Sequence, residues 1–97
     1  MDTTYNEKPS LGDVTVISEY GGLKEFNCLT ANLTKNKKVK FLSKDDEADN
    51  IDWHFTYRGK ALILQYNIYN GLSLMAEKNK YASYANELAG SLRSLCQ

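Results

Sequence analysis

Apolar and polar residues alternate through the middle of the chain, in the segment WHFTYRGKALILQY that begins at Trp53. Because a β-strand sends alternate side chains to opposite faces, this pattern predicts two strands that each have one apolar face. A two-residue turn at Arg58-Gly59 places Phe55 opposite Leu62 and brings the apolar side chains of both strands to one side. We therefore expect Trp53, Phe55 and Tyr57 to be core aromatics under a helix.

A second hairpin is predicted around Asn70 and Gly71. A two-residue turn at these positions would send the apolar residues that follow it to the wrong face of the sheet. A three-residue loop, Tyr69-Asn70-Gly71, pairs Tyr66 with Leu74 and keeps a single apolar face, with Gly71 in the left-handed conformation. We predict this second register.

Apolar residues three and four positions apart predict two helices. The first set follows Gly21-Gly22 and consists of Leu23, Phe26, Leu29 and Leu33. The second set predicts a terminal helix of about four turns and consists of Tyr81, Tyr84, Ala85, Leu88, Leu92 and Leu95. Two further strands are expected at Val14–Tyr20 and Val39–Leu42, and the charged segment after Leu42 is expected to be a loop.

These elements predict an α+β two-layer sandwich with the order β-α-β-β-β-β-α. The sheet is expected to be mainly antiparallel, with the C-terminal helix packed on its apolar face. Residues 1 to 12 show no periodicity and are expected to form a mobile tail, which leaves 13 to 97 as a single domain.

Composition narrows the possible partners and cofactors. Twelve Lys and Arg balance twelve Asp and Glu, so no overall field attracts nucleic acid or an anionic membrane. Two cysteines, Cys28 and Cys96, and one histidine are too few for a zinc site, and we expect both cysteines to be free thiols. With no cationic start before an apolar stretch and no apolar run near 18 residues, we expect a cytoplasmic protein outside the membrane.

The sheet face opposite the predicted core is the main candidate site. It mixes polar residues with isoleucine, tyrosine and methionine, and tyrosine and methionine are enriched at protein interfaces. The candidate interface residues are His54, Thr56, Ile63, Gln65, Tyr69 and Met75. An alternative remains open, in which the first helix or the tail covers this face.

Two charged clusters give further candidate sites. One could dock on a basic protein surface and consists of Asp45, Asp46, Glu47, Asp49 and Asp52. The other could contact the phosphates of a nucleic acid and consists of Lys35, Lys37, Lys38 and Lys40. The calcium-loop motif needs Asp or Asn at its third position, Gly at its sixth and Glu at its twelfth. Counted from Asp45, the acidic segment has Glu47, Asn50 and Thr56 at these positions. We therefore expect no metal site and no cofactor.

Catalysis is not expected either. His54 is the sole histidine, and no recognisable motif places a serine or cysteine beside it. The sequence does not determine the function. It favours a small non-enzymatic protein-interaction module that binds a protein partner or itself, through the candidate face or a strand edge. The alternative is a nucleic-acid-binding accessory protein that uses the lysine cluster.

Overall fold

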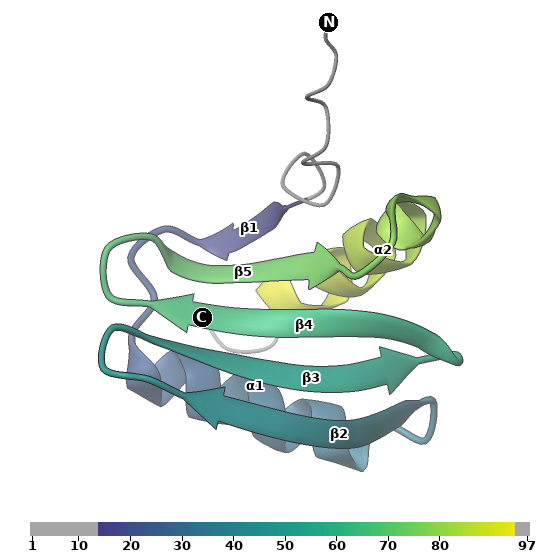
Figure 1. Cartoon of the computed structure of the whole chain (residues 1–97), viewed down its shortest axis with the longest axis horizontal. Helices are drawn as coiled ribbons and strands as arrows, with labels where there is room; N and C mark the ends of the chain where they lie inside the picture. The colour runs from purple at the N-terminus through teal and green to yellow at the C-terminus, as the bar shows by residue number, and fades with distance from the viewer. Residues whose placement is uncertain (1–13, 95–97) are drawn as a thin grey trace, which may run out of the picture.

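The computed structural model describes residues 14 to 94 and shows a five-stranded antiparallel sheet with two helices behind it (Figure 1). The strand order is β1-β5-β4-β3-β2. The elements are β1 (Thr15–Ser18), α1 (Leu23–Lys35), β2 (Val39–Asp46), β3 (Asn50–Tyr57), β4 (Lys60–Asn67), β5 (Gly71–Ala76), the 3-10 helix η3 (Asn79–Tyr81) and α2 (Ala82–Arg93). This architecture confirms the predicted α+β class and element order.

The first hairpin, β3 to β4, has the predicted register. Phe55 pairs with Leu62 and Trp53 pairs with Leu64. Both turn residues have positive φ, 55° at Arg58 and 80° at Gly59, as a two-residue turn of type I′ requires. The alternating pattern therefore identified the turn and the buried face together.

The second hairpin, β4 to β5, differs from the predicted register. Gly71 is left-handed, with φ of 78°, but Tyr66 pairs with Leu72 instead of Leu74. The side chain of Asn67 explains the difference, because its Oδ1 accepts hydrogen bonds from the main-chain N–H groups of Tyr69 (2.8 Å) and Asn70 (3.0 Å). These bonds close the turn over residues 68 to 70, and the apolar face is unchanged.

The core lies between the sheet and the two helices. Phe26, Leu29 and Leu33 point inward from α1, and Leu88 and Leu92 point inward from α2, all with almost no exposed surface. Full burial of one such side chain contributes about 1.5 to 3 kcal/mol. Both helices cover the same face of the sheet (Figure 1), so the alternative in which the first helix covers the other face is wrong.

Strand β2 is longer than expected. We predicted a strand that ended at Leu42 and a charged loop after it, but the strand continues to Asp46, with Asp45 paired to Asp52 and Asp46 to Ile51. Main-chain pairing with the long strand β3 is sufficient to extend an edge strand whose side chains are exposed. Such a strand needs no apolar face, which is why periodicity missed it.

Cys28, on α1, is disulfide-bonded, so its interpretation as a free thiol is wrong. The predicted tail, Leu95 and Cys96 lie outside the described residues. None of the helices between residues 14 and 94 has the length and hydropathy to cross a membrane.

Candidate functional site

The sheet face turned away from both helices carries the predicted interface. We call it the outer face, and strand register assigns to it Val16, Lys40, Ser43, Asp45, Asp52, His54, Thr56, Ala61, Ile63, Gln65, Ser73 and Met75. Five of the six predicted interface residues lie on it. The sixth, Tyr69, lies in the β4–β5 turn and is exposed.

The centre of the outer face is apolar. Ile63 of β4 lies directly opposite Met75 of β5, and both are half-buried. Two hollows meet at Met75. A hollow of about 270 Å³ also has His54, Ile63 and Glu77 in its lining, and one of about 710 Å³ extends towards Val16 on β1. The face is therefore uneven at its centre.

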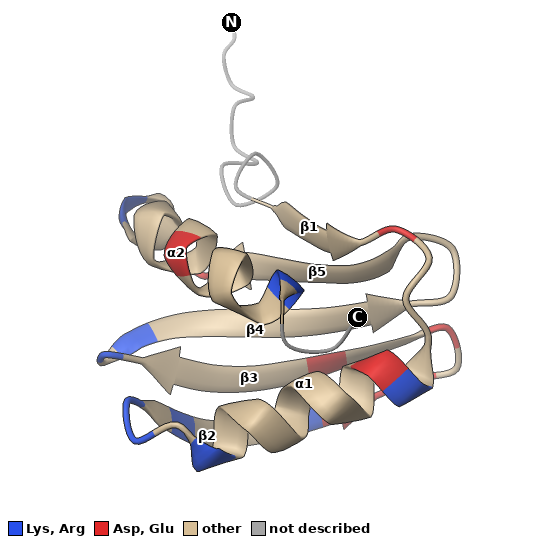
Figure 2. Cartoon of the chain, turned by 180° about the vertical axis from the view of Figure 1, so that it is seen from behind, with Lys and Arg blue, Asp and Glu red and all other residues tan. Residues whose placement is uncertain are grey.

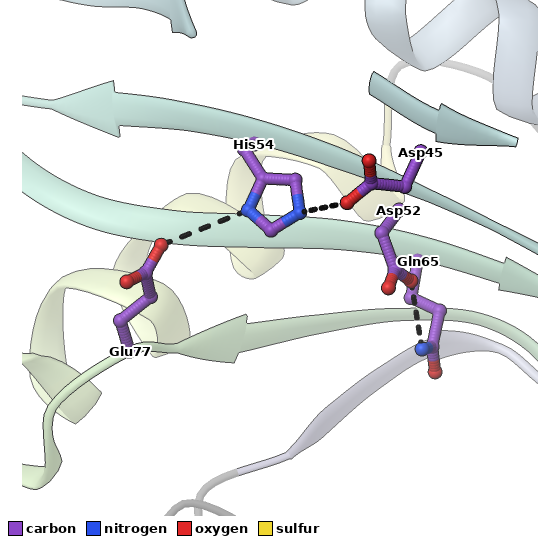
Figure 3. Close-up of polar contacts among 5 residues, drawn as sticks. All are labelled: Asp45, Asp52, His54, Gln65 and Glu77. Atoms are coloured by element: carbon purple, nitrogen blue, oxygen red, sulfur yellow. Dashed lines mark hydrogen bonds and ion pairs between the residues drawn. The ribbon is translucent and has the colours of Figure 1, made fainter. Parts of the chain in front are cut away.

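Polar side chains lie beside this apolar centre, because His54 and Glu77 line the same hollow as Ile63 and Met75. Figure 3 shows His54 between Asp45 and Glu77. The Nε2 atom of His54 lies 3.1 Å from Oδ2 of Asp45, and its Nδ1 atom lies 3.7 Å from Oε2 of Glu77. The three side chains come from β3, from β2 and from the residue after β5. When the imidazole is protonated, it can serve both carboxylates at once.

Asp45 and Asp52 are cross-strand neighbours on the outer face. Two like charges in that position repel each other, and each carboxylate here has a polar partner of its own. Asp45 contacts His54, and Asp52 accepts a hydrogen bond of 2.8 Å from Nε2 of Gln65 (Figure 3). The contacts of His54 and Gln65 offset this repulsion.

The structure divides the predicted acidic cluster. Asp45 and Asp52 join the outer face, Asp46 lies opposite Ile51 on the inner side of the sheet edge, and the remaining two acids lie in or beside the β2–β3 turn. Two features of this site were not predicted from the sequence. Glu77 could have been found, because it continues the alternation of Ser73 and Met75. The contact between Asp45 and His54 could not, because a bulge after Phe41 changes the side-chain alternation in β2.

The lysine cluster surrounds the start of β2. Lys35 ends α1, Lys37 and Lys38 form the turn, Lys40 lies in β2, and all four are exposed (blue in Figure 2). The main-chain N–H of Arg58 donates a 2.9 Å hydrogen bond to the carbonyl of Lys38. The tip of the first hairpin therefore lies next to these lysines, although the Arg58 guanidinium also contacts Glu87 at 3.3 Å.

Both ring nitrogens of His54 face carboxylates. The expectation that His54 has no catalytic role stays a prediction. Between residues 14 and 94, no group of three or more His, Cys, Asp or Glu side chains is arranged to hold a metal ion. Known protein families, curated proteins and solved structures show no match to the chain.

Proposed function

We propose that this protein is a small non-enzymatic protein-interaction module whose contact surface is the outer face. One observation carries the proposal: both helices lie on the other side of the sheet, so Ile63 and Met75 sit at the centre of a sheet face that neither helix covers. A sheet face that only meets water needs no such apolar centre. An apolar centre with polar surroundings is the ordinary build of a protein interface.

The charges of the outer face suggest the chemistry of the partner. Carboxylates of Asp45, Asp52 and Glu77 lie around the apolar centre, and Glu19 lines the larger hollow. The complementary surface is a protein segment that presents apolar side chains bordered by Lys or Arg. Charges at the rim chiefly set association rate and specificity, while the buried apolar centre supplies most of the affinity.

The direct test of this proposal is capture of a partner from native host lysate with tagged protein. The substitution Ile63→Lys puts a charge at the centre of the outer face and should remove a stoichiometric protein partner that the wild type captures. Leu23→Lys is the matched control, because it replaces a half-exposed apolar residue on α1, in the other layer. We expect the Leu23→Lys protein to capture the partner as the wild type does.

The two variants must first be shown to fold, by circular dichroism and thermal unfolding. If folded Ile63→Lys protein retains the partner at wild-type level, the outer face is not the contact surface. Equal loss of the partner in Leu23→Lys would also contradict the proposal, because the effect would not belong to the outer face.

A nucleic-acid-binding role is the second candidate. The observation in its favour is the hydrogen bond that brings Arg58 beside the lysine cluster, which enlarges the basic end of the molecule. Binding of this kind depends on release of counterions, so affinity for nucleic acid must fall steeply as salt rises. Treatment of the lysate with nuclease separates the two candidates: the proposed protein partner survives it, and a nucleic-acid-mediated complex does not.

The cytoplasmic location suggested by the sequence stays a prediction. The disulfide at Cys28 removes one of its two supports, because disulfides are rare in reducing compartments. Fractionation of host cells, followed by detection of the native protein, would test the location directly.

A further inference from the structure

The free edge of β2 is a second surface that the fold leaves open. β2 lies at the end of the sheet, and every residue from Lys40 to Asp46 is exposed, so neither helix covers this edge. Phe41 and Leu42, at its centre, are 48% and 50% exposed. The main-chain groups on this side pair with no strand in the described part of the chain, and such a row is a template for another strand.

The opposite edge, β1, is less suited to pairing. It is only four residues long and contains an irregularity between Val16 and Ser18. The guanidinium of Arg93, on α2, donates a 2.8 Å hydrogen bond to the carbonyl of Val16. The fold therefore leaves one long edge open and one short edge partly occupied.

On the outer side of β2 the charges are separated by sign, with Lys40 near its start and Asp45 near its end. Lys37 and Lys38 precede the strand, Asp46 and Glu47 follow Asp45 in the chain, and Lys44, beside Asp45, lies on the inner side. Figure 2 shows the blue residues gathered around the start of β2. Two antiparallel copies of β2 would place each basic end against the acidic end of the other copy.

The bulge in β2 selects the register of such a pair. Before it, Lys40 points to the outer side and Phe41 to the inner side; after it, Asp45 points to the outer side and Lys44 to the inner side. Residues opposite each other in an antiparallel pair share a face. Pairing Lys40 with Asp45 of a second copy satisfies this rule and also pairs Phe41 with Lys44. In this register, paired residues lie on the same face of the sheet, and Lys40 also lies opposite a residue of opposite charge.

We propose that two copies of this chain associate through their β2 edges, antiparallel, with Lys40 of each copy opposite Asp45 of the other. The two sheets then form one continuous sheet, and Leu42 of each copy lies next to the twofold axis. That axis is perpendicular to the sheet, so both outer faces point the same way. The proposal goes beyond the interaction role and does not depend on it.

Lysines and bulges often protect edge strands from pairing. A protective strand carries charges that repel any partner, whereas β2 carries both signs in an order that attracts its own antiparallel copy. Exposed Phe41 and Leu42 at its centre also do not fit a purely protective role, because burial of apolar area favours pairing.

The test is sedimentation equilibrium of the full chain and two charge-reversal variants, Lys40→Glu and Asp45→Lys, up to about 1 mM, the weak end of specific association. The wild type should dimerise. In a dimer of either variant, positions 40 and 45 carry charges of the same sign, and the twofold symmetry brings them opposite each other at two places. We expect the dissociation constant of such a dimer to be higher by about tenfold or more. An equimolar mixture of the two variants should dimerise again, because every substituted side chain then meets an opposite charge.

Lys80→Glu is the matched control, since it reverses the same charge on η3, away from β2. Its dimer should match that of the wild type. A wild type that stays monomeric overturns the proposal, as does a dimer that Lys40→Glu leaves unchanged, or a mixture that fails to associate. Partner capture by the wild type is measured separately from dimerisation. A failed dimerisation test therefore does not contradict the outer-face proposal, and a failed capture test does not contradict the β2 dimer.

Discussion

Two separate constraints, a left-handed φ and a close main-chain contact, require glycine at position 71. Its φ of 78° lies in the left-handed region, which costs other residues about 1 to 2 kcal/mol. It also lies against the chain that leaves β1, and a Cβ there would collide with the main-chain carbonyls of Ser18 and Glu19. Pattern analysis predicted the first reason, from the need to keep one apolar face. The second depends on β1 pairing with β5, which a local pattern does not reveal.

Alanine substitutions should separate these two effects. Gly71→Ala combines left-handed strain with a backbone collision, and we expect a loss of about 2 to 4 kcal/mol in the free energy of unfolding. Gly59→Ala has φ of 80° but open space around the added methyl, so a loss of about 1 to 2 kcal/mol is expected. Gly90→Ala lies inside α2 with open space and should gain about 0.5 to 1 kcal/mol.

Urea denaturation of the three variants checks this order. A Gly71→Ala protein no less stable than Gly59→Ala would show that the chain after β1 does not pack against Gly71 as described.

At the scale of elements, Glu87 connects α2 to the tip of the first hairpin. Its Oε2 accepts a 3.0 Å hydrogen bond from the hydroxyl of Tyr57 and lies 3.3 Å from the guanidinium of Arg58. Burial raises the pKa of the Tyr57 phenol above its ordinary value of 10.0, and the hydrogen bond to Glu87 raises it further. The parity of the strand predicted that Tyr57 faces the helix, but nothing in the sequence identified Glu87 as its partner.

This contact predicts a pH effect on stability. Because the folded pKa of Tyr57 exceeds the unfolded pKa, its contribution is fully present below about pH 10 and is lost as the pH rises through the folded value. Tyr57→Phe should lower the free energy of unfolding by about 1 kcal/mol at neutral pH, through loss of the hydrogen bond. The difference between the two proteins should shrink above pH 10.

Chemical denaturation of both proteins between neutral pH and about pH 11 measures this difference. A constant difference over the whole range would show that the ionisation of Tyr57 is not coupled to folding.

At the scale of the whole molecule, the fold is a sheet with helices on one side only. In β3 and β4, alternation predicted both sides of the sheet correctly, because their side chains could satisfy only one pairing. Strand order was not predictable, since Val16 in β1 pairs with Ser73 in β5 and the two are far apart in the chain. The face of the sheet that α1 covers was also not predictable, because an amphipathic stripe does not specify which face it packs against.

Dimerisation through β2 would give this one-sided fold a larger surface. Two outer faces on the same side of one continuous sheet could hold two segments of one partner, and such double attachment strengthens binding without any new contact. The outer face is open in the monomer and in the dimer alike, so binding through it does not depend on dimerisation.

Photo-crosslinking in living host cells, with a photoreactive amino acid at position 63, tests most directly whether a partner binds the outer face. The control position is 31, where Ala31 is exposed on α1. We expect a discrete crosslinked protein from position 63 and none of the same mass from position 31. The same crosslinked protein from both positions, or none from position 63 while the folded protein is abundant, would contradict it.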